Sequence, residues 1–194
     1  MGEMLERIYG ILFQPVGTLR DICQTRPLKQ AVLVIVVAAV FTTWTGYFAA
    51  LPNSIFVIAA MAVTLAVWFV GSAITHLVAE LMAGKGQAAG LLAANGYVQV
   101  LRIFSVPVVV LSSLAPAPLK VGILLLGSTG LFVWEVVLTV IAIRENYGFS
   151  NKKACLTLVV PYLAVFLVSC AFAAVIAKVF LQSMAQRGLG GIMP

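Results

Sequence analysis

Five long apolar blocks, separated by short polar or proline-containing segments, dominate the hydrophobic pattern of this chain. The blocks run from Gln30 to about Leu51, from Ile55 to Met82, from Leu91 to Leu114, from Lys120 to Ile143 and from Ala154 to Met184. Each is long enough to supply the roughly 20 residues that an α-helix needs to cross the hydrocarbon layer of a bilayer. A soluble core needs no such runs. The pattern therefore predicts an all-α polytopic membrane protein, a bundle of five transmembrane helices.

The residues before the first block have a different pattern. Apolar residues recur at helical spacing with charged residues on the other side, namely Met4, Leu5, Ile8, Ile11 and Leu12 against Glu3, Glu6 and Arg7. This is typical of an amphipathic helix that lies in the membrane interface. Pro15 ends or kinks that helix, a second turn carries Leu19 and Ile22, and Pro27 marks the entry to the first span. We therefore predict cytoplasmic interfacial helices over 1–29, a five-span membrane domain over 30–184 and a short glycine-rich tail over 185–194.

The basic residues indicate an orientation for these spans. With a cytoplasmic N-terminus and five spans, eight basic residues fall on the cytoplasmic side: Arg7, Arg20, Arg26, Lys29, Lys85, Arg144, Lys152 and Lys153. The other side holds only Lys120, Arg187 and, depending on where the last span ends, Lys178. Because cytoplasmic segments of membrane proteins carry an excess of Lys and Arg, we predict a cytoplasmic N-terminus and a C-terminus outside.

The composition agrees with a membrane protein and argues against a nucleic-acid-binding protein. The chain of 194 residues is 62% hydrophobic and 9% charged, with a mean hydropathy of +1.11. Its net charge of +6 sits mostly at the ends of spans, where it suits anionic lipid headgroups. No basic soluble domain remains to bind nucleic acid. The three cysteines show no CxxC spacing, so we expect no disulfide framework, and Cys23 is a candidate for palmitoylation near the membrane.

Four ionisable residues within the predicted spans are candidates for a role, because charge there is costly. His76 and Glu80 share one face of the second span, Arg102 lies a few turns into the third, and Glu135 lies in the fourth. We hypothesise a Glu80–Arg102 ion pair in the cytoplasmic half of the bilayer, with Glu135 as an alternative or third partner. Such a set can line a cavity for a polar headgroup, an ion or a proton. It can also simply join helices, and we favour that interpretation because partnered charges are tolerated in membranes.

The same residues do not form a catalytic or metal-binding set. His76 and Glu80 supply at most two of the four ligands that a bound metal usually has. Gly84-Lys85-Gly86 lacks the GxxxxGK[ST] spacing of a phosphate-binding loop. No nucleophile lies beside the single histidine. We therefore predict no catalytic residue, no cofactor and no metal, in a protein that is not an enzyme.

The order of several short motifs resembles a known family. The first span is preceded by Phe13-Gln14-Pro15 and Pro27, and the second ends with His76-Leu77 and Gly84-Lys85-Gly86. The third span contains Tyr97 and Pro107, and the fourth contains Trp134. The last span is preceded by Ser150 and Lys153-Ala154. From about Ile11 to Phe180 this order is similar to the bacterial branch of the Yip-one domain family, the Rab-interacting membrane proteins of the Golgi and endoplasmic reticulum. The resemblance implies five spans and a cytoplasmic N-terminus.

The resemblance does not carry over the whole role of the family. Its eukaryotic members act in vesicle trafficking through partner GTPases and associate with themselves and with each other. This chain lacks their long polar N-terminal region and the Asp-Leu-Tyr-Gly-Pro type of motif before the first span, so the Rab role is not expected. We expect a scaffold or adaptor in the bacterial inner membrane that binds lipids and other membrane proteins or itself. The alternative is a small transporter or lipid-handling protein whose path is lined by Glu80, Arg102 and Glu135.

Overall fold

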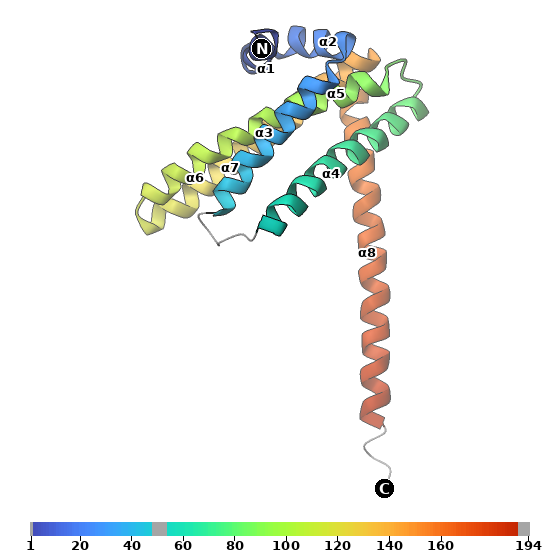
Figure 1. Cartoon of the computed structure of the whole chain (residues 1–194). Helices are drawn as coiled ribbons and strands as arrows, with labels where there is room; N and C mark the ends of the chain where they lie inside the picture. Colours follow the sequence, from blue (N-terminus) through green and yellow to red (C-terminus); the bar gives the residue numbers. More distant parts are fainter. Residues whose placement is uncertain (1, 48–53, 190–194) are drawn as a thin grey trace. The chain divides into compact units, whose positions relative to one another are not determined.

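The computed structural model describes residues 2–47 and 54–189, and every element within these ranges is a helix (Figure 1). The elements are α1 (Gly2–Phe13), α2 (Pro15–Thr25), α3 (Leu28–Tyr47), α4 (Ser54–Leu81), α5 (Ala88–Val98), the 3₁₀ helix η1 (Gln99–Phe104), α6 (Ser105–Leu114), α7 (Ala117–Tyr147) and α8 (Asn151–Leu189). The all-α prediction is confirmed for these residues. The chain divides into two units, residues 1–158 and 159–194.

Three segments are long and apolar enough to cross a membrane within the described ranges. They are Val57–Leu81 in α4, Ala88–Leu114 across α5, η1 and α6, and Ala117–Tyr147 in α7. A shorter apolar stretch, Leu28–Thr43, occupies most of α3. These segments coincide with the second, third, fourth and first predicted blocks. The predicted end of the first block at Leu51 lies outside the described residues.

The two N-terminal helices lie at one end of the bundle formed by α3 to α7 (Figure 1). Pro15 occupies the first turn of α2, where its missing N–H costs nothing, and so separates α2 from α1 as expected. α2 packs against α5 and α7. Its residues Leu19 and Ile22, together with Ile11 of α1, are fully buried there. The apolar face of α1 is therefore divided, since Ile11 faces the protein core while Leu5 and Tyr9 stay exposed.

The third candidate span is not one regular helix. Between α5 and α6 the chain tightens into the 3₁₀ segment η1. A proline inside an α-helix lacks the N–H for the i−4 bond, and its ring clashes with the carbonyl of that residue. Pro107 would meet the carbonyl of Ile103 in this way, which explains why the irregular turn precedes α6. The hydroxyl of Ser105 also donates to the carbonyl of Arg102 at 2.6 Å and so supports the local geometry.

The largest buried side chains gather at the same end as α1 and α2. One cluster contains Leu19, Tyr97 and Leu138, and a second contains Ile143 and Tyr147. The spans are exposed elsewhere, because the most apolar stretches of α4 and α7 bury only 6% of their residues inside the chain. Lipid solvates such surfaces without a hydrophobic penalty.

The last helix is longer than expected. α8 continues from Asn151 to Leu189, with Pro161 inside it. The helix therefore includes 185–189, the first residues of the predicted tail. Residues 190–194 of that predicted tail lie outside the described part of the chain.

Candidate functional site

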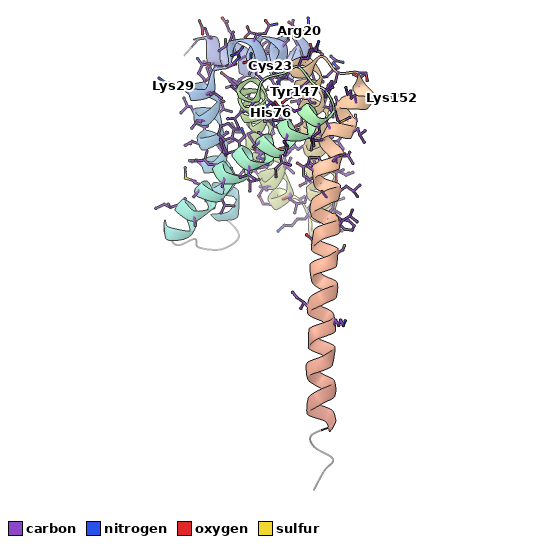
Figure 2. The ribbon with its side chains drawn as sticks, turned by 90° about the vertical axis from the view of Figure 1, so that its right-hand side faces the viewer. Arg20, Cys23, Lys29, His76, Tyr147 and Lys152 are labelled. Atoms are coloured by element: carbon purple, nitrogen blue, oxygen red, sulfur yellow. The ribbon has the colours of Figure 1, made fainter. Side chains whose placement is uncertain are left out.

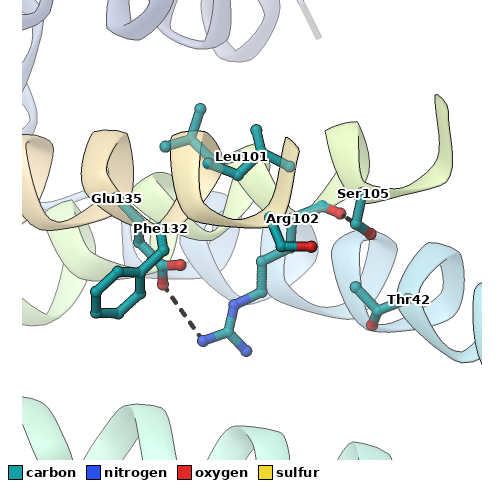
Figure 3. Close-up of a pocket in the computed structure, with 8 residues that line it drawn as sticks. Thr42, Leu101, Arg102, Ser105, Phe132 and Glu135 are labelled. Atoms are coloured by element: carbon teal, nitrogen blue, oxygen red, sulfur yellow. Dashed lines mark hydrogen bonds and ion pairs between the residues drawn. The ribbon is translucent and has the colours of Figure 1, made fainter. Parts of the chain in front are cut away.

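Arg102 and Glu135 form an ion pair in the middle of the apolar helices. Arg102 Nη2 donates to Glu135 Oε1 at 3.3 Å. The two side chains come from η1 and α7 and point toward each other across the gap between these helices (Figure 3). They are 42% and 27% exposed, so the pair is not sealed inside the chain. A charged pair in this position is the main candidate for a functional site.

A cavity of about 190 Å³ opens beside this pair. Its polar lining comes from Thr42 of α3, Arg102 of η1, Ser105 of α6 and Ser128 and Glu135 of α7. Apolar side chains complete the wall, namely Leu101, Leu131 and Phe132. The site thus combines one cation, one anion and several hydroxyl groups within an apolar rim.

The hypothesised Glu80–Arg102 pair is wrong, because Arg102 is joined to Glu135, the alternative partner. Glu80 instead lies one helical turn from His76, with His76 Nε2 and Glu80 Oε1 3.4 Å apart. The predicted set of four residues therefore separates into two pairs. His76 and Glu80 form one within α4, and Arg102 and Glu135 form the other between η1 and α7.

His76 also contacts a residue that the sequence did not single out. Its Nδ1 lies 2.6 Å from the hydroxyl of Tyr147 at the end of α7, and the two rings are stacked (Figure 2). Tyr147 stacks in turn on Phe149. A β-carbon at Gly86 would lie 2.5 Å from Tyr147, so the loop after α4 can approach the ring only because this residue is glycine. The contacts join α4, the following loop and α7.

A second network joins the N-terminal helices to the bundle. Gln30 Oε1 accepts hydrogen bonds from the Tyr97 hydroxyl at 2.6 Å and from Arg7 Nη1 at 2.9 Å. Arg7 Nε also donates to Asp21 at 3.1 Å. Sequence reasoning assigned Arg7 to the polar face of an interfacial helix and missed its partner Gln30. No local motif marks such a network, because its members are far apart in sequence.

A third network lies where α2 meets α7. Glu145 is nearly buried and accepts from Arg20 Nε at 2.8 Å and from Arg144 Nη2 at 2.7 Å. Arg144 Nη1 also donates to Asn151 at the start of α8. Two guanidinium groups thus balance one carboxylate. The network begins directly after Ile143, the predicted end of the fourth block, where α7 continues to Tyr147.

Two buried acceptors lack a hydrogen-bond partner within the described part of the chain, Asn95 Oδ1 and Gln99 Oε1. Both lie on one face of the third span, four residues apart. The amide nitrogen of Asn95 donates to Ser72 Oγ at 3.0 Å, which ties α5 to α4. Each of these oxygens can still accept a hydrogen bond, for example from a water molecule.

Cys23 is buried against α7, with its Sγ 3.9 Å from the carbonyl oxygen of Ala142. Burial raises the pKa of its thiol to about 12, because the interior disfavours the thiolate. The expectation that Cys23 is available for palmitoylation is therefore wrong, since acylation needs an accessible thiol.

Among the residues whose side chains the structure describes, no group of three or more His, Cys, Asp or Glu could hold a metal. The pairs described above hold helices together by charge and hydrogen bonding.

Comparison with known proteins identifies one relationship. The family model for the Yip1 domain matches residues 9–173, most of the chain. The resemblance inferred from the order of the sequence motifs is thereby confirmed. Neither a curated protein nor a solved structure matches the chain.

Proposed function

This chain belongs to the Yip1 domain family of membrane proteins, and we propose that it acts as a non-enzymatic scaffold that binds other membrane proteins through its outward-facing spans. The observation that carries the proposal is the small buried share of its apolar helices. The most apolar stretches of α4 and α7 bury only 6% of their residues inside the chain. A surface of this extent offers long lateral faces to partner helices.

Small residues on these faces support the same proposal. A β-carbon at Gly71 of α4, or at Gly122 or Gly130 of α7, would meet nothing within 4 Å. Helices in lipid associate by close van der Waals packing, which glycine permits by letting two backbones approach. These three positions are thus open on the outside of the chain.

We also propose the membrane topology of this scaffold. The first and fifth spans would be α3 and α8, added to the three segments long and apolar enough to cross. Residues 1–29 would be cytoplasmic, 30–184 would form the membrane domain, and the C-terminal end from 185 would be outside, in the bacterial inner membrane. Support comes from Arg20, Lys29 and Lys152, which lie at the same end of the first unit (Figure 2). This clustering agrees with the positive-inside rule.

The exposed side of α1 supports an interfacial position for that helix. Leu5, Tyr9 and Phe13 follow one another at a spacing of four residues and are all exposed, while Tyr9 and Phe13 pack with ring centroids 4.6 Å apart. Glu3 and Glu6 lie on the remaining face. An exposed apolar stripe beside a charged face suits a helix that rests at the lipid boundary.

The transporter alternative has less support. The cavity beside Arg102 measures about 190 Å³, below the roughly 300 Å³ at which sites that enclose a whole small molecule usually begin, so it has room for only part of a larger ligand. The charges that would line a path are already joined in pairs, Arg102 with Glu135 and His76 with Glu80. Paired charges of this kind suffice to fix helices against one another.

Site-specific photocrosslinking in the native membrane tests the scaffold. A benzoylphenylalanine residue replaces Val67 in α4 or Leu126 in α7, both of which are strongly exposed, so the bundle can accept it. We expect one of the two positions to give an adduct with another protein of defined mass. The same residue at Lys85, in the polar loop after α4, is the control and should not give that adduct. Adducts with lipid alone at both positions would refute the proposal.

A further inference from the structure

The Arg102–Glu135 pair leaves much of its hydrogen-bonding capacity unused. A single hydrogen bond of 3.3 Å joins the two groups, and both remain partly exposed. Arginine offers five N–H donors in a planar fork, and a charge open to hydrocarbon is expensive. A polar ligand that meets these free donors and acceptors would therefore be stabilised here when the helices lie in a bilayer.

The lining of the cavity defines the chemistry of that ligand. The guanidinium group of Arg102 suits a phosphodiester, whose oxygens can accept two parallel hydrogen bonds. The carboxylate of Glu135 suits a primary ammonium group. The hydroxyl group of Ser128 lies in the same wall and can bind either. Because one cation and one anion stand together, the site favours a ligand of no net charge that carries both signs.

The position of the site indicates where such a ligand comes from. Glu135 lies nine residues before Arg144, which is about 13 Å along the helix axis from the polar end of α7. Phe132, in the wall of the cavity, is itself largely exposed on the outside of the bundle. The cavity therefore opens beside an apolar surface that acyl chains can cover. A headgroup drawn inward from one leaflet can reach it while its chains stay in the bilayer.

We propose that the cavity between η1 and α7 binds the zwitterionic headgroup of a phospholipid, with Arg102 holding the phosphodiester and Glu135 holding a primary ammonium group. Phosphatidylethanolamine carries this combination. The inference needs the membrane placement of these helices but not the scaffold role, so either can fail without the other. A bound lipid here would complete the ion pair and fasten η1, the irregular part of the third span, to α7.

Native mass spectrometry of delipidated protein in detergent tests this site. The protein is offered equal amounts of phosphatidylethanolamine, phosphatidylcholine and phosphatidylglycerol. We expect phosphatidylethanolamine to be retained at least about fivefold more than either other lipid. The choline group lacks N–H donors, and the glycerol headgroup lacks a cation, so each loses one charge-assisted hydrogen bond. Equal retention of the three lipids would overturn the proposal.

Variants of the charged residues test whether the preference for phosphatidylethanolamine arises in this cavity. The double variant Arg102→Gln, Glu135→Gln removes both charges together, so neither is left alone, and it should lose the preference. Glu80→Gln makes the same chemical change at an exposed carboxylate outside the cavity and should keep it. If the double variant does not fold, the single variant Glu135→Gln provides the test, because it removes only the partner of the ammonium group, and it should reduce the preference for phosphatidylethanolamine over phosphatidylcholine. Retention of the full preference in the variants of the cavity would contradict the proposal.

Two further outcomes separate the lipid from other occupants. Free phosphorylethanolamine has the same polar groups without acyl chains. If it displaces the lipid at equal concentration, the site recognises a soluble ligand and the lipid proposal is wrong. If the lipid-free protein is a dimer that dissociates in the double variant, a second copy covers the ion pair, and the proposal is again wrong.

Discussion

Tyr97 of α5 donates its buried hydroxyl to Gln30 of α3 at 2.6 Å, and the same Gln30 oxygen accepts from Arg7 of α1 at 2.9 Å. One amide oxygen therefore joins three helices at the end of the bundle. The ring of Tyr97 is fully buried in the cluster that also contains Ile11 and Leu19. The contact explains how two short N-terminal helices become part of the fold.

Tyr97→Phe should lower the free energy of unfolding by about 1 kcal/mol, the usual net value of one hydrogen bond. Gln30→Leu should lower the free energy of unfolding by more, about 2 to 3 kcal/mol, because it leaves a buried hydroxyl and a guanidinium group without their acceptor. Thermal unfolding in detergent measures both. Tyr9→Phe, at an exposed tyrosine of α1, is the matched control. An equal loss for Tyr9→Phe and Tyr97→Phe would show that the network does not stabilise the bundle.

Gly96 sets the distance between α3 and α5. A β-carbon there would lie 2.8 Å from Cβ of Ala31, so any larger residue forces the two helices apart. Gly96→Val should therefore lower the stability by about 1 to 3 kcal/mol, the range for overpacked sites. Gly130→Val in α7 meets nothing within 4 Å and should be neutral. Unfolding temperatures that are the same for both variants would contradict this packing.

Cys23 should resist alkylation in the folded protein. In a variant that keeps only this cysteine, N-ethylmaleimide at pH 8 should react slowly until a denaturing detergent unfolds the protein and exposes the thiol. Mass spectrometry measures the extent of the reaction. Because burial raises the pKa of Cys23 from 9.0 to about 12, the unfolded state loses its proton first as the pH rises. Stability should then fall between about pH 9 and pH 12, and Cys23→Ala should remove that part of the fall. Rapid labelling of the folded protein would show that the thiol is accessible.

The proposed topology predicts opposite accessibility for two lysines. In a background without native cysteines, a cysteine at position 120 should react with a membrane-impermeant maleimide in intact cells. One at position 85 should react only after the membrane is permeabilised, because Lys85 is assigned to the cytoplasm. Labelling of both positions after permeabilisation is the control. Labelling of position 85 but not of position 120 in intact cells would show that the orientation is the reverse of the one proposed. Equal labelling of both positions in intact cells would exclude an odd number of spans between them.

Long apolar runs made most of the helices predictable. The second block, expected from Ile55 to Met82, corresponds closely to α4, Ser54–Leu81. Pro15 correctly marked the boundary between the two N-terminal helices. Such features are local, since length, hydropathy and proline geometry act within one segment. The interruption of the third span by η1 was not expected, although Pro107 supplies a physical reason for it.

The partners of the charged residues were harder to predict. An ion pair between helices depends on how each helix is rotated about its axis. In a span that is apolar on nearly every side, hydropathy does not define that rotation. The expected depth of each residue in the bilayer allows Arg102 to contact either Glu80 or Glu135 and does not decide between them. Tyr147 was missed for the same reason, because its contact with His76 depends on where the end of α7 lies relative to α4.

The central claim, that this Yip1 domain protein is a scaffold for other membrane proteins, is tested most directly by native mass spectrometry of the tagged protein extracted gently from its own membrane. The account predicts a complex that contains a second, different membrane protein at a fixed ratio. Recovery of the chain alone, or only with copies of itself and a bound lipid, would contradict the scaffold and favour a lipid-handling role.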